Sequence, residues 1–151
     1  MKKIILTATA ILYTVFAFSQ ELNSSDGKYY KDGDLYTGTV QEYYGNGNIK
    51  MEISIVDGLQ DGLTFLYFEN GKIHEQRSYE DGMKDGTWIT YDQNQNKTAE
   101  ANFKNDLKHG KWYTWDKNGN KRYEIYYEEG EKKGDWYMWD ENGNLAMERH
   151  Y

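Results

Sequence analysis

The sequence contains no cysteine. This absence excludes disulfides, thiolate nucleophiles and cysteine-ligated metals, and it also excludes a lipid anchor attached to a cysteine after export. An excess of basic residues is lacking too, because 18 Lys and Arg stand against 25 Asp and Glu among the 151 residues, for a formal charge of −7. Nucleic acid and anionic lipid are poor partners for such a surface. Because no disulfide or cysteine-bound metal can hold the fold together, stability must come from packing.

The chain also lacks an apolar run of the roughly 20 residues that span a bilayer. Its uncharged apolar stretch, Ile4 to Phe18, follows two lysines and ends near the small residues Ala17 and Ser19. This pattern is typical of a cleavable signal peptide over residues 1–19, with the cut after Ser19, and a short membrane anchor is the alternative. We expect an exported protein, periplasmic or secreted, with no membrane span in the mature chain. Loss of the two lysines leaves 16 basic against 25 acidic residues, a formal charge of −9.

The chain is rich in aromatic residues, which make up 17% of it and are arranged in a repeat. Glycine returns every 24 residues, at Gly38, Gly62, Gly86, Gly110 and Gly134. We number these glycines as position 0 of five units, which cover residues 38–61, 62–85, 86–109, 110–133 and 134–151. Position 5 is Tyr or Trp in every unit and position 8 is Asn. Residues 20–37 precede the units, and their segment Tyr29 to Gly33 resembles the end of an incomplete unit that would cap the array.

Each unit alternates apolar and polar residues on both sides of its Asn, as a β-hairpin does. Asp57-Gly58 and Asp81-Gly82 mark a second kind of turn, which would join one hairpin to the next. The predicted fold is therefore all-β, an elongated single-layer antiparallel β-meander of tandem 24-residue hairpins. Two strands about 4.8 Å apart give roughly 9.6 Å per unit.

The turn within each hairpin decides which residues share a face. We predict a three-residue loop at positions 7 to 9, with a type I turn and the glycine of position 9 in the left-handed region. Position 5 would then face position 11, and position 3 would face position 13. On this interpretation the odd positions 3, 5 and 17 form a packed aromatic face, and position 14, mostly Glu, lies on a wet face.

Position 2 carries Trp88, Trp112 and Trp136 in three successive units. An even position places these indoles on the predicted wet face, where they are candidate partner-binding residues. A contact strip for a partner protein or for sugar rings is one interpretation, since indole combines a flat apolar face with one hydrogen-bond donor. The other is that each indole covers its cross-strand neighbour or the turn between units.

No catalytic constellation is found, and we expect no enzyme. His74, His109 and His150 occupy three different unit positions, and the serines have no His or Asp in a repeated relation to them. The turns at Asp116 and Asp140 resemble calcium-binding loops, but their glycine stands at the fourth place rather than the sixth, so a tight turn explains them better. No cofactor and no metal are expected.

The string from Gly110 to Asn120, with the Asp-Gly-x-x-x-Gly link from Asp81 to Gly86, resembles the bacterial MORN-type variant repeat. The chain is also similar to the YwqK-type antitoxin family, and the resemblance covers residues 38–151. It implies an open β-meander and a role as an immunity or antitoxin partner that binds a toxin protein.

Three positions and the signal peptide depart from that pattern. Unit 3 has Gln95 in place of glycine. Unit 1 has Val40 where units 3 to 5 have tryptophan, and Gln41 where later units have an aromatic or aliphatic residue. A single-layer sheet with an aromatic face has to cover it by twisting, by forming a homodimer or by binding another molecule. The sequence therefore predicts a protein–protein interaction module, with a glycan- or envelope-binding protein as the alternative.

Overall fold

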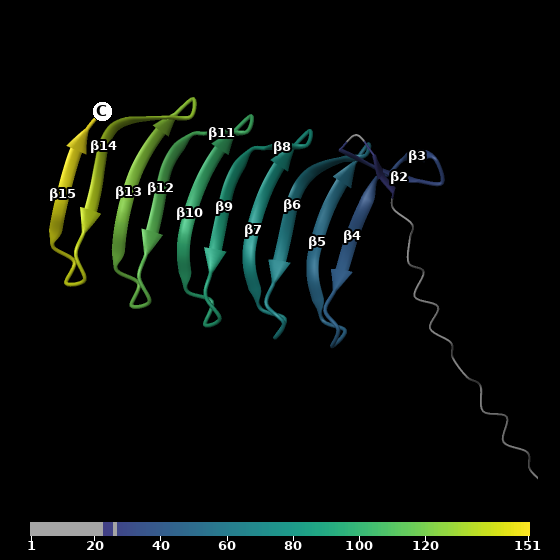
Figure 1. The fold of residues 1–151 in the computed structure, drawn as a ribbon, viewed down its shortest axis with the longest axis horizontal. Coiled ribbons are helices and arrows are strands. Elements are labelled where there is room, and N and C mark those ends of the chain that lie inside the picture. Colours follow the sequence, from purple (N-terminus) through teal and green to yellow (C-terminus); the bar gives the residue numbers. More distant parts are fainter. Residues whose placement is uncertain (1–22, 26) are drawn as a thin grey trace, which may run out of the picture.

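The computed structural model describes residues 23–25 and 27–151, and this part consists of strands and turns (Figure 1). No helix of the described part is long and apolar enough to cross a membrane. The predicted signal peptide and its cleavage site lie outside the described residues and stay predictions.

Ten strands follow one another in a single antiparallel sheet in the order of the sequence, two from each unit, so the predicted meander is confirmed (Figure 1). The first strands of the units are β4 (Gly38–Tyr43), β6 (Leu59–Tyr67), β9 (Gly86–Tyr91), β12 (Gly110–Trp115) and β14 (Glu131–Trp139). The second strands are β5 (Ile49–Val56), β7 (Ile73–Glu80), β10 (Lys97–Lys104), β13 (Lys121–Glu128) and β15 (Leu145–His150). Two short strands, β8 (Met83–Lys84) and β11 (Leu107–Lys108), lie in the turns between units.

The N-terminal segment forms a small antiparallel sheet of its own from β1 (Asn23–Ser25), β2 (Lys28–Lys31) and β3 (Asp34–Leu35). It is tied to the turn after unit 1, because Gly58 N–H donates to Tyr36 O at 2.8 Å and Tyr29 N–H donates to Gly58 O at 2.8 Å. The segment therefore lies against the first of the turns that join the units.

The turn inside each hairpin is the predicted three-residue loop. Gly119 N–H donates to Asp116 O at 3.0 Å and Asp116 N–H donates to Asn120 O at 2.9 Å, and the other units repeat this pattern. Position 9 has a φ of 82° at Gly119 and of 68° at Gln95, so this position is left-handed even where the glycine is missing. We call these turns the tips.

Gly119→Ala isolates the cost of that left-handed backbone, because a Cβ at Gly119 would meet nothing within 4 Å. We expect the free energy of unfolding to fall by about 1–2 kcal/mol, the cost of left-handed backbone for a residue with a Cβ. Gly45→Ala is the matched control in the tip of unit 1, since Gly45 has equally open surroundings without a left-handed φ. Denaturant titration checks both variants, and equal stability of the two would contradict the argument.

The predicted faces are wrong for the second strand of each hairpin, because every hairpin contains a β-bulge. In unit 4, Trp115 pairs with Lys121 as predicted, but Tyr113 pairs with Glu124, so that position 3 faces position 14 rather than 13. One residue, position 12, is extra on the second strand. Beyond this bulge every side chain of the second strand changes face. Position 17 therefore shares a face with position 2, and the Glu of position 14 shares a face with the rings of positions 3 and 5.

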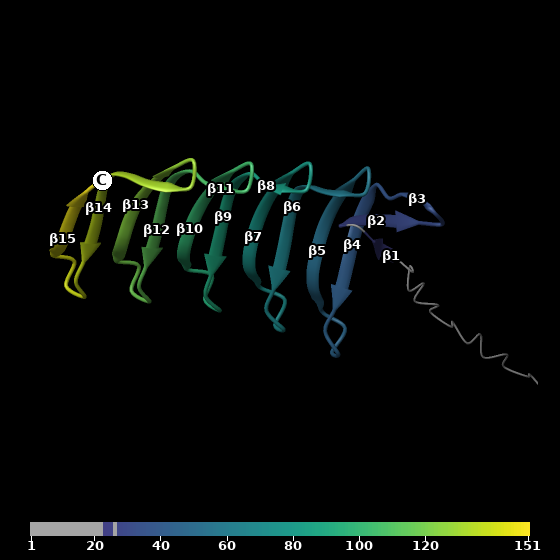
Figure 2. The same ribbon diagram turned by 45° about the horizontal axis from the view of Figure 1, so that its top comes forward.

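A second irregularity lies between units and bends the chain. Ile53 pairs with Thr64 but Ile55 pairs with Gln60, so the first strand of unit 2 has two extra residues around Gly62. The glycine at position 0 has a φ between 67° and 93° in units 2 to 5. Glycine adopts this conformation without steric cost. The repeated glycine thus marks a corner of the chain. The inter-unit turn that precedes it in the sequence comes forward from the sheet (Figure 2).

We call the row of inter-unit turns the flange. Its two-residue turns have both φ values positive, as in Asp81-Gly82 with 49° and 81°. Successive turns are hydrogen-bonded: Gly82 N–H donates to Gln60 O at 2.8 Å, and Gly130 N–H donates to Lys108 O at 2.9 Å. The flange is therefore a backbone ladder running alongside the sheet.

The most completely buried side chains lie where the flange of unit 1 meets the sheet. Ile53, Ile55 and Thr64 are 3%, 2% and 2% exposed, and Tyr127 occupies an equivalent place in unit 4 at 7%. The Thr64 hydroxyl has no hydrogen-bond partner among the described residues.

Thr64→Val should stabilise the protein by about 1 kcal/mol, because it removes a buried hydroxyl without a partner and keeps the shape of the side chain. Valine already occupies this unit position at Val40. Thr87→Val is the control: its hydroxyl donates to Asn102 Oδ1 at 2.7 Å, and its loss should destabilise by about 1 kcal/mol. Thermal unfolding separates the two signs, and destabilisation by Thr64→Val would contradict this account.

Candidate interaction surface

The three tryptophans lie on the face that the flange covers, which we call the corner face. Trp88 and Trp112 alternate with the rings at position 17 in one continuous ladder along the sheet. Its successive ring centroids, from Tyr79 through Trp88, Phe103 and Trp112 to Tyr127, are 4.9–5.4 Å apart. Tilted and edge-on pairs at this distance stabilise neighbouring strands. For Trp88 and Trp112 the geometry thus supports the interpretation in which the indole covers its cross-strand neighbours. The binding role of the three tryptophans stays a prediction.

Two of the indole N–H groups are already bonded to the sheet. Trp88 Nε1 donates to Ser78 O at 2.9 Å and Trp112 Nε1 donates to Asn102 O at 2.8 Å. Trp136 Nε1 is buried and has no partner in the described part of the chain. The indole N–H groups are therefore either bonded or buried, and the tryptophans present ring surface to a ligand.

A lysine at position 22 lies over each tryptophan. The ammonium of Lys84 is 5.2 Å from the Trp88 centroid, that of Lys108 is 4.7 Å from Trp112, and that of Lys132 is 4.8 Å from Trp136. These are cation–π distances, and each contact contributes about 0.5–1 kcal/mol at a partly exposed site. We call Lys84, Lys108 and Lys132 the lysine row. It fills the inner corner between the flange and the sheet.

The opposite face, which we call the open face, also carries aromatic rings. Tyr113 and Trp115 are 5.5 Å apart with ring planes at 32°, and Tyr137 and Trp139 are 5.8 Å apart at 31°. Lys121 lies between the two pairs and forms an ion pair with a glutamate of the same strand. Each of the two faces therefore carries aromatic rings, and the predicted wet face does not exist.

The ion pairs of the open face set the charge state of its carboxyls. The Glu124 carboxylate forms ion pairs with the ammonium groups of Lys121 at 2.7 Å and Lys111 at 3.0 Å. Partial burial raises the pKa of Glu124, but the two ammonium groups outweigh it and hold the pKa below its usual value. The positive charges of Lys111 and Lys121 are thus compensated by a carboxylate on the same face.

The three histidines are far apart in the repeat and have different neighbours. His74 packs on Phe68 with ring centroids 4.4 Å apart, and His150 contacts the Asp135 carboxylate. In the described residues, no group of three or more His, Asp and Glu side chains could hold a metal ion.

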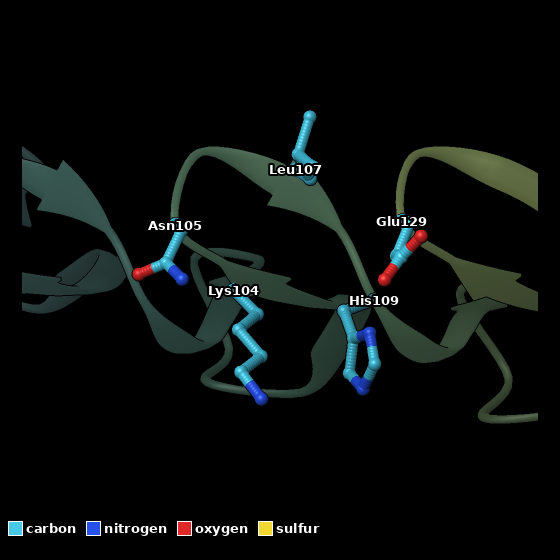
Figure 3. Close-up of a pocket in the computed structure, with 5 residues that line it drawn as sticks. All are labelled: Lys104, Asn105, Leu107, His109 and Glu129. Carbon is cyan, nitrogen blue, oxygen red and sulfur yellow. The ribbon is translucent and has the colours of Figure 1, made fainter.

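The third histidine, His109, lines a surface hollow of about 470 Å³ on the flange (Figure 3). Its other lining residues are Lys104, Asn105, Leu107 and Glu129. Lys104 and His109 point to one side of the ribbon and Leu107 to the other (Figure 3). The hollow is a gap between neighbouring turns of the flange.

The tips of units 3 to 5 are held by an aspartate at position 6. Asp140 Oδ1 accepts the backbone N–H of Asn142 at 2.9 Å and that of Asn144 at 2.8 Å, and Asp92 accepts the equivalent N–H groups in unit 3. The backbone N–H of the Asn at position 10 is the main cause that lowers the pKa of Asp92 and Asp140 below 3.8. Asp116 has a lowered pKa as well, since its hydrogen bonds to Asn120 and Asn118 together exceed the opposing effect of desolvation.

These lowered pKa values predict a contribution to acid sensitivity. A carboxyl with a lowered pKa in the folded state stabilises the fold above its unfolded pKa, and this contribution is lost as the pH falls from about 3.8 through the folded pKa. Replacing Asp92, Asp116 and Asp140 by Asn keeps the acceptor oxygen but removes the titration. We expect a shallower loss of stability between neutral pH and pH 3 in the triple variant, measured by denaturant titration at each pH. An unchanged slope would contradict this role.

The lysine row is a functional feature that was not predicted from the sequence. Its signal is present at position 22, where Lys84, Lys108 and Lys132 recur at intervals of 24 residues. A lysine next to a predicted turn is common at a solvated surface, so the repetition alone did not separate it from the other charged positions. These lysines can be told apart only once the corner at position 0 is known, because the corner brings the lysine of position 22 over the tryptophan of position 2.

The sequence pattern of the MORN repeat variant family matches residues 36–57, 60–81, 108–129 and 132–151. Each match begins two residues before a position 0 glycine, so it contains the corner and the hairpin that follows. The unit that contains Gln95 is not matched. A search of curated proteins finds no match for the chain.

Proposed function

Because the chain belongs to the MORN repeat variant family, whose pattern fills more than half of its length, we propose that it is an exported, non-enzymatic repeat protein that binds another protein. The observation that carries this proposal is the inner corner of the fold. There, half-buried tryptophans and the lysine row repeat in three successive units along one line. Extended surfaces of this kind are what repeat arrays use to bind partners.

The tryptophans supply apolar area at this surface and the lysines supply hydrogen-bond donors. Aromatic residues are enriched in the cores of protein interfaces, where their rings bury a large area with few rotatable bonds. Trp88, Trp112 and Trp136 keep this role in the proposal. A finer proposal takes the partner to be a toxin and the chain to be its immunity-type partner, as the resemblance to the YwqK-type antitoxins implies.

Site-specific photo-crosslinking in cells that produce the protein tests the proposal. A photoreactive amino acid replaces Lys108 in the inner corner, or Asn142 at an exposed tip as the control. We expect a discrete crosslinked protein at position 108 and none at position 142. The finer proposal requires that this protein, produced alone, arrests growth and that coproduction of the chain relieves the arrest. No crosslink at position 108, or the same products at both positions, would overturn binding at the inner corner.

A second candidate function, glycan binding, is favoured by the open face. The Tyr113–Trp115 and Tyr137–Trp139 pairs present half-exposed rings beside charged side chains, and flat rings flanked by hydrogen-bonding groups suit sugar rings. The candidate predicts retention on cell-wall or polysaccharide matrices that is lost in the Trp115→Ala/Trp139→Ala double variant and kept in Trp112→Ala. Absence of retention, or retention that the double variant leaves unchanged, would discard it.

A further inference from the structure

The lysine row differs from the lysines of the open face in its ionic partners. Lys97 and Lys121 each form an ion pair at 2.7 Å with a glutamate on their own strand. In the part of the chain that the structure describes, no carboxylate lies within 4.0 Å of the ammonium groups of Lys84, Lys108 or Lys132. The Asp106 carboxylate accepts the backbone N–H of Lys84 at 2.9 Å but does not reach its ammonium group. In a protein with a formal charge of −7, these three ammonium groups are thus left without an ion pair in the described residues.

Each ammonium of the row lies over two rings. Lys108 lies 4.7 Å from the Trp112 centroid and 4.9 Å from that of Tyr127. Lys132 is held in the same way between Trp136 and Tyr151. An ammonium has three donors and the rings engage only one side of it, so donors remain for an anion on the other side. Because the two ring contacts restrict the lysine side chain, binding a carboxylate costs less side-chain entropy than it would at a lysine without such contacts.

The spacing of the row follows from the ring ladder beneath it. Trp88 and Trp112 are both neighbours of Phe103, with centroids 4.9 Å and 5.1 Å away, so equivalent groups of neighbouring units are about 10 Å apart. A polyproline II chain rises about 3.1 Å per residue with three residues per turn, so that every third side chain recurs on one side after about 9.3 Å. The row therefore matches a peptide with a carboxylate at every third residue.

We propose that the lysine row binds an extended acidic segment of the partner protein, with Asp or Glu at every third residue and each carboxylate seated on one lysine. This rests on the proposed function, and it specifies the chemistry of the partner. Arg149, whose guanidinium is 5.3 Å from the Trp136 centroid and which also has no ion pair in the described residues, places a second cation at the ring under Lys132. The rings between the lysines contact the intervening residues of the segment.

The charge density of the row favours a peptide over a nucleic acid. One strand of DNA carries a negative charge every 3.4 Å, whereas the row offers one cation about every 10 Å. Most phosphates of a bound strand would thus remain unpaired beside a protein whose overall charge repels them. A peptide with one carboxylate per turn leaves no charge unpaired on either side.

The test uses the full mature chain and two synthetic peptides of identical composition. One has five Glu-Pro-Ser repeats, and the other has its five Glu residues in one block. We expect the repeat peptide to bind, by isothermal titration calorimetry, at least tenfold more tightly than the block peptide. The Lys84→Gln/Lys108→Gln/Lys132→Gln variant should lose at least tenfold in affinity, whereas Lys31→Gln/Lys104→Gln/Lys117→Gln, three exposed lysines outside the inner corner, should change it less than twofold. Far-UV circular dichroism and thermal unfolding establish that both variants are folded.

Equal binding of the two peptides, or full affinity in the lysine-row variant, would overturn the proposal. Tighter binding of single-stranded DNA or of an anionic polysaccharide than of the repeat peptide would also overturn it, in favour of a polyanion site. Photo-crosslinking at position 108 distinguishes a failure of the acidic-segment proposal from a failure of the proposed function. A crosslinked protein without peptide binding refutes the acidic segment and leaves the proposed function standing, whereas the absence of both refutes the function itself.

Discussion

Trp112→Ala is expected to lower the free energy of unfolding by about 3 kcal/mol, within the range for tryptophan truncations in packed sites. The substitution removes ring contacts to Phe103 and Tyr127, each at 5.1 Å. It also removes the indole hydrogen bond to Asn102 O at 2.8 Å and the ring under Lys108. Aromatic pairs contribute about 0.5–1.5 kcal/mol each, and the hydrogen bond and the cation–π contact about 1 kcal/mol each. The Asn102 carbonyl keeps the N–H of His109 at 2.9 Å, so no buried acceptor is left without a partner.

Trp115→Ala is the matched control, because it removes the same side chain from the same strand on the opposite face. Trp115 has one ring neighbour, Tyr113 at 5.5 Å, and a lysine 5.7 Å from its centroid. We expect a loss of about 1–2 kcal/mol. Hydrogen exchange followed by mass spectrometry measures both variants without relying on tryptophan fluorescence. In Trp112→Ala it should show lost protection concentrated in units 3 and 4, which hold the ring and carbonyl partners of Trp112. Equal losses in the two variants would mean that the ladder of the corner face is not the main packing of the sheet.

The repeat could be predicted because local chemistry determines it. The glycine at position 9 and the Asn at position 8 specify a three-residue tip wherever they occur, and the structure has that tip even at Gln95. The order of the strands followed as well, since short turns between hairpins allow only neighbouring strands to pair. These features depend on a few residues close in sequence.

The faces could not be predicted, because they depend on one residue of register. The bulge at position 12 has no glycine or proline to mark it, and its occupants range from Lys50 to Ala146. A single extra residue moves position 17 from the face of Tyr113 to the face of Trp112. The candidate site could be predicted only in part for a similar reason. The tryptophans were identified by their spacing, but the lysines above them come from the other side of a corner that strand periodicity does not reveal.

Gly58→Ala is expected to detach the N-terminal segment from the array. A Cβ at this buried glycine would lie 3.0 Å from Tyr29 O, which is backbone, and 2.7 Å from Leu35 Cδ2, and φ there is 78°. The left-handed conformation costs about 1–2 kcal/mol and the overpacking about 1–3 kcal/mol more. Because two backbone hydrogen bonds at 2.8 Å tie the segment to Gly58, the structure can relieve the clash by releasing residues 27–37.

Gly82→Ala separates the two costs. Gly82 has nearly the same φ, 81°, at the same turn of the next unit, but the nearest atom to its Cβ would be the flexible end of Leu59 at 3.3 Å. This control should lose only the backbone cost of about 1–2 kcal/mol and keep the segment docked. Limited proteolysis between residues 27 and 37, with hydrogen exchange at Tyr36 and Gly58, reports release directly. If Gly58→Ala and Gly82→Ala are equally resistant, the N-terminal segment is not held by close packing at this glycine. Its place on the flange must then come from other contacts, such as the hydrogen bond from Asp57 N–H to the Thr37 hydroxyl at 2.9 Å.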